Sequence, residues 1–248
     1  MQRLNKFIAS SGICSRRKAD ELILEGKIAV NGKIINELGF QVGPKDKVTI
    51  DNQLIKPQKL EYYRFYKPAG YITTSDDEKG RKTIYDIIPP ELKHLKPVGR
   101  LDKDSTGLII MTNDGDFINE MTHPSIKVPK IYIVSINGKL SPEDGKKMYD
   151  GIEIETDSGE KKIAHAEVFP IEIKNSSSMI RVTLYQGINR QIRKMFAVLG
   201  FEVISLKRIQ HATITLEGLK KGQIKLMKPK QINELKSFIN KIKKAENA

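Results

Sequence analysis

The sequence predicts an α+β protein with a small amino-terminal domain and a larger second domain. Residues 1–58 contain two short amphipathic helical stretches followed by two hairpin-like pieces. From residue 64 onward, many strand-length stretches are separated by few helical ones, and no internal repeat is visible. We therefore expect domains at residues 1–58 and 64–248, joined by a linker at residues 59–63.

Turn and cap residues define the elements of the first domain. Gly12 and Gly26 are placed to end two successive helices, and Ser15 can cap the second one. The Asn31-Gly32 pair that follows is the strongest short-range signal for a hairpin turn. The predicted order is therefore helix, helix and hairpin, with a second hairpin before the linker.

Three cations crowd the start of the second helix: Arg16, Arg17 and Lys18. They oppose the helix macrodipole and repel one another. A positive helix start with free backbone amides suits a phosphate group. The alternative is a basic face exposed to water.

Periodicity divides the second domain into strands and helices. Short apolar or alternating runs are typical of strands, and apolar residues three or four apart are typical of helices. Strands are expected over residues 62–65, 71–74, 108–111, 130–136, 180–185, 203–208 and 212–216, with more within 152–173, and helices over residues 114–122, 143–149, 187–199 and 232–242.

Asp102 is the candidate catalytic residue because of its place in the chain. It lies in a polar, glycine-bracketed loop that leads into the buried strand predicted at residues 108–111. Functional groups are often carried by loops that a rigid element supports. An ordinary turn rich in Asp and Gly is the alternative. A calcium loop is disfavoured, because Asn113 stands where an EF-hand needs a bidentate Glu and no helices flank the loop.

Two further stretches bring chemistry-bearing side chains together. Lys130 and Tyr132 share one face of a predicted strand, although the tyrosine can also be read as simple packing with its hydroxyl in water. Arg190, Arg193 and Lys194 gather near the start of a later helix, against its macrodipole. A negative group should compensate them, either an Asp of the protein or a phosphate of a substrate.

Composition limits the partners and the compartment. The 248-residue chain has a formal net charge of +13 and a pI near 9.6, which favours a polyanionic partner, nucleic acid above all. No apolar run approaches the ~20 residues of a membrane helix, and the amino terminus lacks the apolar core of a signal peptide. The single cysteine, Cys14, suits a reducing cytosol and therefore a cytoplasmic location. We also expect a monomer with no membrane partner. Scattered histidines and the lack of phosphate-loop or dinucleotide motifs predict no metal and no small-molecule cofactor.

Three runs of the first domain are distinctive. They are Arg-Leu-Asn-Lys-Phe-Ile-Ala at residues 3–9, Gly-Ile-Cys-Ser-Arg-Arg-Lys-Ala-Asp-Glu-Leu-Ile at residues 12–23, and Gly-Lys-Ile-Ala-Val-Asn-Gly at residues 26–32. Together they resemble an S4 RNA-binding domain, whose fold is α-L-like. The resemblance implies RNA binding but no catalytic activity, because such domains also occur in non-catalytic proteins.

Four motifs follow one another in the second domain. They are Lys-Pro-Ala-Gly at residues 67–70, Gly-Arg-Leu-Asp at 99–102 with Ser-Thr-Gly-Leu at 105–108, Lys-Ile-Tyr at 130–132, and Gly-Ile-Asn-Arg-Gln-Ile-Arg-Lys-Met at 187–195. They resemble the motifs of RNA pseudouridine synthases. Behind an S4-like domain, the arrangement is similar to the RsuA/RluB/RluE/RluF branch, on its RluB/RluF side. The resemblance implies a catalytic domain with a mixed, mainly antiparallel sheet.

The resemblance also implies roles for individual residues. Asp102 is expected to be the catalytic carboxylate, held ionised by Arg193, and Tyr132 is expected to stack on the target base. Arg100 matches the residue that fills the space left by a base flipped out of the RNA. Further RNA-binding residues are expected to be Lys130, Arg190, Arg16, Arg17 and Lys18.

The implied reaction is the isomerisation of uridine to pseudouridine in ribosomal RNA, with 23S rRNA favoured over 16S rRNA and tRNA. No cofactor is needed, because the atoms of the substrate are conserved. Asp102 would act either as a nucleophile at C1′ or as a base at C2′. A non-catalytic S4-type RNA-binding factor in ribosome assembly is the alternative of a different class. A glycosidase using Asp102 and Asp104 is disfavoured, because nothing else suggests a sugar cleft.

Overall fold

The computed structural model describes residues 1–74 and 77–246. These residues divide into two compact units. The first comprises Met1–Glu61 together with Asn113–Gly115, and the second comprises Tyr62–Thr112 and Asp116–Ala248. Both contain helices and strands, which confirms the predicted α+β class.

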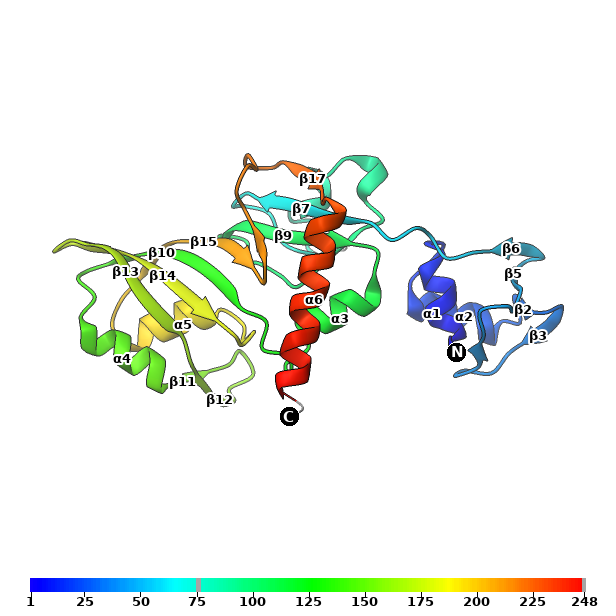
Figure 1. Cartoon of the computed structure of the whole chain (residues 1–248), viewed down its shortest axis with the longest axis horizontal. Helices are drawn as coiled ribbons and strands as arrows, with labels where there is room; N and C mark the ends of the chain where they lie inside the picture. Colours follow the sequence, from blue (N-terminus) through cyan, green and yellow to red (C-terminus); the bar gives the residue numbers. More distant parts are fainter. Residues whose placement is uncertain (75–76, 247–248) are drawn as a thin grey trace. The chain divides into compact units, whose positions relative to one another are not determined.

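The first unit packs two helices against a small antiparallel sheet (Figure 1). Ile8 and Ile23 of the helices and Ile28 of the sheet are almost fully buried in one core. The helices are α1 (Leu4–Ser10) and α2 (Arg16–Leu24), the four-stranded sheet contains β2 (Ile28–Val30), β3 (Lys33–Ile35), β5 (Val48–Ile50) and β6 (Gln53–Ile55), and β1 (Gln2–Arg3) pairs with β4 (Gln41–Val42).

The predicted cap and turn residues account for these elements. The Ser15 hydroxyl accepts a hydrogen bond from a backbone N–H in the first turn of α2. Asn31 and Gly32 both have positive φ, as a two-residue type I′ turn requires. Asp51 and Asn52 make the same kind of turn between β5 and β6. Local sequence therefore specifies both hairpins.

The second unit is built on one large sheet. Its strands are β7 (Tyr62–Lys67), β8 (Lys96–Pro97), β9 (Thr106–Thr112), β10 (Lys130–Asn137), β13 (Glu167–Ile173), β14 (Ser177–Leu184), β15 (Val203–His211), β16 (Ile214–Thr215) and β17 (Ile224–Leu226). Their order is β13-β14-β10-β15-β9-β7-β17, with β16 beside β15 and β8 beside β9. Among these described strands, neighbours are antiparallel except β9 and β15, which run parallel. The mainly antiparallel sheet is as predicted.

Helices pack against this sheet and form two separate hydrophobic cores with it. They are α3 (Gly115–Thr122), α4 (Pro142–Asp150), α5 (Gln191–Val198) and α6 (Pro229–Glu246), with a separate hairpin of β11 (Ile152–Glu155) and β12 (Lys161–Ala164). Leu108 and Ile110 of β9 pack with α3 and α6, whereas Ile109 and Met111 belong to the core that includes α4 and α5. Strand β9 is therefore buried on both faces.

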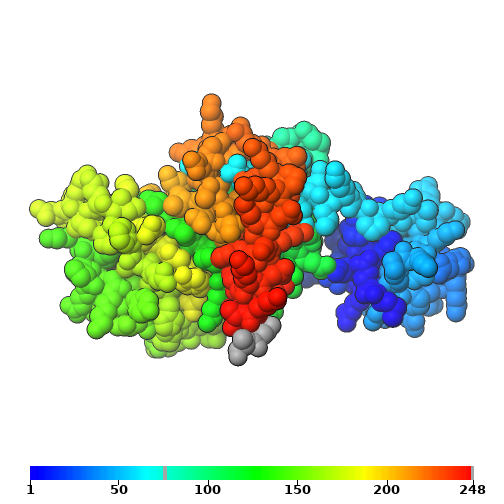
Figure 2. Space-filling view, in the orientation of Figure 1, coloured from blue at the N-terminus to red at the C-terminus, as the bar shows by residue number. Residues whose placement is uncertain are grey.

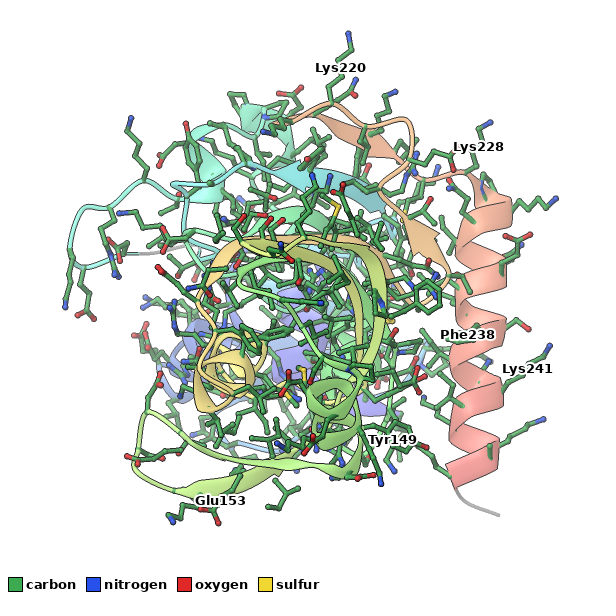
Figure 3. All side chains as sticks on the ribbon, turned by 90° about the vertical axis from the view of Figure 1, so that its left-hand side faces the viewer. Tyr149, Glu153, Lys220, Lys228, Phe238 and Lys241 are labelled. Atoms are coloured by element: carbon green, nitrogen blue, oxygen red, sulfur yellow. The ribbon has the colours of Figure 1, made fainter. Side chains whose placement is uncertain are left out.

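The last helix lies along the surface of the second unit (Figure 2). Leu235 and Ile239 are buried, and Phe238 faces the same core. Lys241 extends from α6 away from the unit, and Lys220 and Lys228 also point outward (Figure 3). No described helix combines the length and the apolar character that a membrane crossing requires.

Three sequence expectations differ from the structure. Residues 71–74 are no strand of the sheet, because Ile72 makes only an isolated bridge to Thr83 and follows a loop. Tyr62 and Tyr63 lie in β7, as the strand expected from residue 62 predicted, so the linker expected at residues 59–63 extends too far. The helix expected over residues 187–199 begins only at Gln191, because the preceding residue has a left-handed backbone conformation. That conformation turns residues 187–190 into a loop.

Candidate active site

A cleft of about 1230 Å³ opens in the second unit. Its walls come from the loop before β9, from β10 and β15, and from the loop that enters α5. Of the candidate residues, it contains Arg100, Asp102, Lys130, Tyr132 and Arg190. Segments that are far apart in the sequence are thus brought together around one cavity.

Lys67 holds the loop that carries Asp102 through hydrogen bonds to its backbone. This lysine ends β7 and is fully buried. Its Nζ donates hydrogen bonds to the backbone carbonyls of Asp102 (2.9 Å), Ser105 (2.8 Å) and Lys103 (3.2 Å). Burial lowers the pKa of Lys67 to about 8, while nearby Asp102 and Asp104 act to raise it. A buried lysine side chain thus defines the path of the loop that carries Asp102.

Two further contacts hold the same loop. The Thr73 hydroxyl donates to the carbonyl of Leu101 (2.8 Å) and accepts from the Leu101 N–H (3.3 Å). Gly107 has a φ of +118°, and a Cβ there would lie 2.2 Å from the carbonyl oxygen of Arg208. Only glycine allows β9 to approach β15 so closely. The loop of Asp102 therefore leads into a strand that packs closely against β15, which also lines the cleft.

Strands β10 and β15 place four polar side chains beside this loop. Tyr132, which is 7% exposed, lies directly opposite Arg208, and Lys130 lies opposite His211. All four line the cleft. Lys130 donates to the backbone carbonyl of Val128 (2.9 Å). The predicted pair Lys130 and Tyr132 thus faces two basic residues that the sequence did not single out.

The loop entering α5 carries Arg190, which lines the cleft at its exposed rim. The expected compensating carboxylate is present for one of its neighbours: Lys194 forms an ion pair with Asp157 (2.6 Å). Asp157 also accepts a hydrogen bond from Asn189 (2.6 Å). Part of the positive charge at the start of α5 is therefore balanced by the protein itself.

The expected ion pair between Asp102 and Arg193 is not present among the described residues. Arg193 does not line the cleft. Its Nη1 donates instead to the carbonyl of Val203 (2.9 Å), the first residue of β15, and its buried Nε has no hydrogen-bond partner. In this conformation Arg193 joins α5 to the sheet, because the helix turns this side chain toward β15.

The basic residues of the first unit lie at the start of α2 as predicted. Lys18 pairs with Glu21 (2.7 Å) on the exposed helix surface. Arg16 and Arg17 are exposed and, among the described residues, make no ion pair. Two of the three cations are therefore free to contact an anion.

Comparison with known families identifies the kind of protein that carries this cleft. A family model described as RNA pseudouridylate synthase matches residues 61–198, and a model of the S4 domain matches residues 2–48. The chain belongs to the RNA pseudouridylate synthase family. The S4 match gives this synthase an RNA-binding domain ahead of the catalytic one, as the sequence predicted.

Individual relatives of the synthase agree over most of its length. It is 38% identical to ribosomal large subunit pseudouridine synthase B of Bacillus subtilis over 245 residues, which cover 99% of this chain and all of the relative. It is 37% identical to the dual-specificity RNA pseudouridine synthase RluF of Escherichia coli, covering 89% of this chain and 73% of the relative. A solved pseudouridylate synthase has a TM-score of 0.68 and 27% identity, over 95% of this chain and all of that one. The predicted enzyme class is confirmed.

Sequence reasoning gave no role to four residues of the synthase's site: Lys67, Thr73, Arg208 and His211. Lys67 is the first residue of the Lys-Pro-Ala-Gly motif, but its support of the Asp102 loop was not predicted. Arg208 and His211 gave no signal, because their common orientation depends on an irregularity in strand pairing between β10 and β15.

Proposed function

We propose that this RNA pseudouridine synthase modifies a specific uridine of ribosomal RNA, with 23S rRNA as the favoured target and Asp102 as the catalytic carboxylate. The observation that carries the proposal is the position of Asp102. Its loop is held by Lys67 and Thr73 at the edge of a cleft that also contains Tyr132. A carboxylate held on a rigid support in this way is suited to catalysis.

The reaction requires one bond to break and another to form at the same sugar carbon. The C1′–N1 bond of uridine breaks, the base turns, and a C1′–C5 bond forms; the proton on C5 is lost and N1 gains one. One carboxylate suffices, either as a nucleophile that attacks C1′ or as a base that removes the proton on C2′. Asp102 fills that role in our proposal.

Tyr132 and Arg100, which line the same cleft as Asp102, also support the proposal. Tyr132 is buried on β10 and offers its ring as a surface on which the uracil stacks. Arg100 is exposed two residues before Asp102 and also lines the cleft. In our proposal it occupies the space left in the RNA when the target base turns out. Arg190 and Lys130 contact the RNA at the rim and on the wall.

The substrate is inferred from the relatives. The B. subtilis relative, which aligns with this chain from end to end, is named for the large ribosomal subunit. This supports 23S rRNA as the target and a cytoplasmic location for the enzyme. The E. coli relative is named as having dual specificity, so more than one RNA has to be tested. The alternatives to 23S rRNA are 16S rRNA and tRNA.

The experiment is to map pseudouridines in all stable RNAs of cells with and without this gene. We expect the deletion to remove pseudouridine at one or a few 23S rRNA positions, and we expect the wild-type gene to restore them. The Asp102→Asn gene should not restore them. Loss of a modification only in 16S rRNA or tRNA would contradict the 23S assignment, and an unchanged map would favour a purely RNA-binding role.

A further inference from the structure

The cleft contains a basic cluster formed by the half-buried Lys130 and the buried Arg208 and His211. In the antiparallel pairing of β10 and β15, Lys130 lies opposite His211 and Tyr132 lies opposite Arg208. Directly opposite side chains have Cβ atoms about 5 Å apart. The register shifts between Ile131 and Tyr132, so β15 has one extra residue between Arg208 and His211. This bulge turns both basic side chains to the face that carries Lys130 and Tyr132.

The cluster is withdrawn from water and only partly hydrogen-bonded. Arg208 is 2% exposed and His211 is fully buried. Arg208 Nε donates to the carbonyl of Leu108 (2.7 Å), but its Nη2 has no partner among the described residues. Both ring nitrogens of His211 also lack one. Buried polar atoms in folded proteins almost always have a partner, so these atoms point to a polar ligand in the cleft.

No carboxylate of the described residues forms an ion pair with this cluster. Burial and the positive charge of Arg208 lower the pKa of Lys130 to about 8. Burial and the charges of Arg208 and Lys130 also lower the pKa of His211 well below its usual value. Neighbouring cations that are partly or fully withdrawn from water and have no counter-ion are unfavourable, and an anion placed between Lys130 and Arg208 would relieve that cost.

We propose that Lys130, Arg208 and His211 form a phosphate-binding subsite that holds a backbone phosphate of the nucleotide whose base stacks on Tyr132. The proposal rests on the proposed function, because it names the chemical group of the RNA substrate that this part of the cleft recognises. Lys130 makes the contact at the cleft surface. Arg208 supplies charge behind it through its unpartnered Nη2, and His211 adds a hydrogen-bonding nitrogen.

A phosphate fits these residues better than the uracil base does. Uracil is neutral when it enters the site and becomes negative only after its bond to C1′ breaks. A backbone phosphate is negative throughout binding and reaction, so it can stabilise the buried cations in the ground state. The two possibilities predict different kinetics, because phosphate binding affects affinity whereas stabilisation of departing uracil affects the rate.

The first test uses the full chain and small probes. The imidazole resonances of the four histidines are assigned by substituting the exposed ones with Gln: His94, His123 and His165. The protein is then titrated with uridine 5′-monophosphate, uridine and inorganic phosphate. We expect uridine 5′-monophosphate to shift the imidazole resonances of His211 and uridine to leave them unchanged. Lys130→Met should weaken the binding of the monophosphate about tenfold or more. Lys147→Met removes the same charge from the exposed surface of α4 and should have no effect.

Three results of this titration would overturn the proposal. They are an equal shift of His211 by uridine and its monophosphate, no shift by either, and a response to inorganic phosphate alone. The last result would indicate a site for a free anion. Because this titration needs no turnover, it separates failure of the subsite from failure of the proposed isomerase function, which would appear as a wild-type enzyme that makes no pseudouridine in any RNA.

The second test measures single-turnover rates on the mapped target RNA. Lys130→Met should raise the half-saturating enzyme concentration about tenfold or more and leave the saturated rate nearly unchanged. Thermal melting confirms that the variant is folded. A reduced saturated rate with unchanged half-saturation would show that Lys130 acts on the departing uracil, and the phosphate assignment would be wrong.

Discussion

Lys67 is the residue on which the geometry of Asp102 depends most directly. Lys67→Met keeps the apolar stem but removes the donor that holds the carbonyls of Asp102, Lys103 and Ser105. Removing a buried charge offsets part of the cost of those unpaired carbonyls, so we expect a loss of stability of only about 1–3 kcal/mol. The loop should loosen, and activity should fall at least about 100-fold.

Equilibrium unfolding and single-turnover assays of Lys67→Met measure these two effects separately. Thr73→Val is the matched control, because it removes the two hydrogen bonds of another side chain to the same loop while the lysine stays in place. Its activity should fall by less than that of Lys67→Met. A Lys67→Met enzyme with wild-type turnover would show that the loop holds its shape without the ammonium.

Arg193 is the residue for which the structure and the family resemblance differ most. Its guanidinium contacts the carbonyl of Val203 and makes no ion pair with Asp102. If the residue is catalytic as predicted, Arg193→Leu should lose activity at least about 100-fold while the protein stays folded. If it only joins α5 to β15, stability should fall by about 1 kcal/mol and saturated turnover should persist. Measuring melting and turnover of the same variant decides between these roles.

At the scale of elements, the parallel contact between β9 and β15 depends on Gly107. A Cβ at this position would meet the backbone of Arg208 at 2.2 Å in addition to adopting a positive φ. A positive φ alone costs a residue with a Cβ about 1–2 kcal/mol. Gly107→Ala should therefore lower the free energy of unfolding by more than this amount. Gly218→Ala is the control, since its φ is +73° but nothing lies within 4 Å.

Urea unfolding compares Gly107→Ala, where both a φ of +118° and the close approach of Arg208 oppose a Cβ, with Gly218→Ala, where a φ of +73° is the only obstacle. We expect Gly107→Ala to lose clearly more stability and also activity, because the loop of Asp102 leads into β9. Equal losses in the two variants would mean that the strands can separate at little cost.

Most elements could be predicted from local signals. The hairpin turn at Asn31-Gly32 and the cap at Ser15 are specified by residues next to them, and the apolar run of β9 identifies a buried strand. The basic cluster could not be predicted, because the face on which Arg208 and His211 point is set by an extra residue in strand pairing. Periodicity within one strand carries no information about such an irregularity.

At the scale of the whole molecule, the S4 domain should supply affinity and leave chemistry to the second domain. Replacing Arg16, Arg17 and Lys18 with Gln should weaken binding to target and non-target RNA alike, because phosphate contacts carry no sequence information. The slope of log affinity against log salt should fall by about 0.7 to 0.9 for each lost contact. The rate at saturating RNA should change little.

Binding at several salt concentrations tests this division of labour. The control replaces Lys33, Lys45 and Lys47, which carry the same charge elsewhere in the first unit. A smaller change in slope for the control is expected. Equal slopes for both triple variants would show that the domain attracts RNA only through its overall positive charge. An unchanged slope for the variant at Arg16, Arg17 and Lys18 would show that α2 does not contact the RNA.

The most direct test of the account compares two neighbouring carboxylates. Tritium release from C5-labelled uridine in the target RNA is measured for the wild type, Asp102→Asn and Asp104→Asn. Both variants lose one negative charge from the same loop, but only Asp102 lines the cleft. We predict that Asp102→Asn binds RNA and releases no tritium, whereas Asp104→Asn retains most of the wild-type rate. Measurable turnover by Asp102→Asn would contradict the assignment of Asp102 as the catalytic carboxylate.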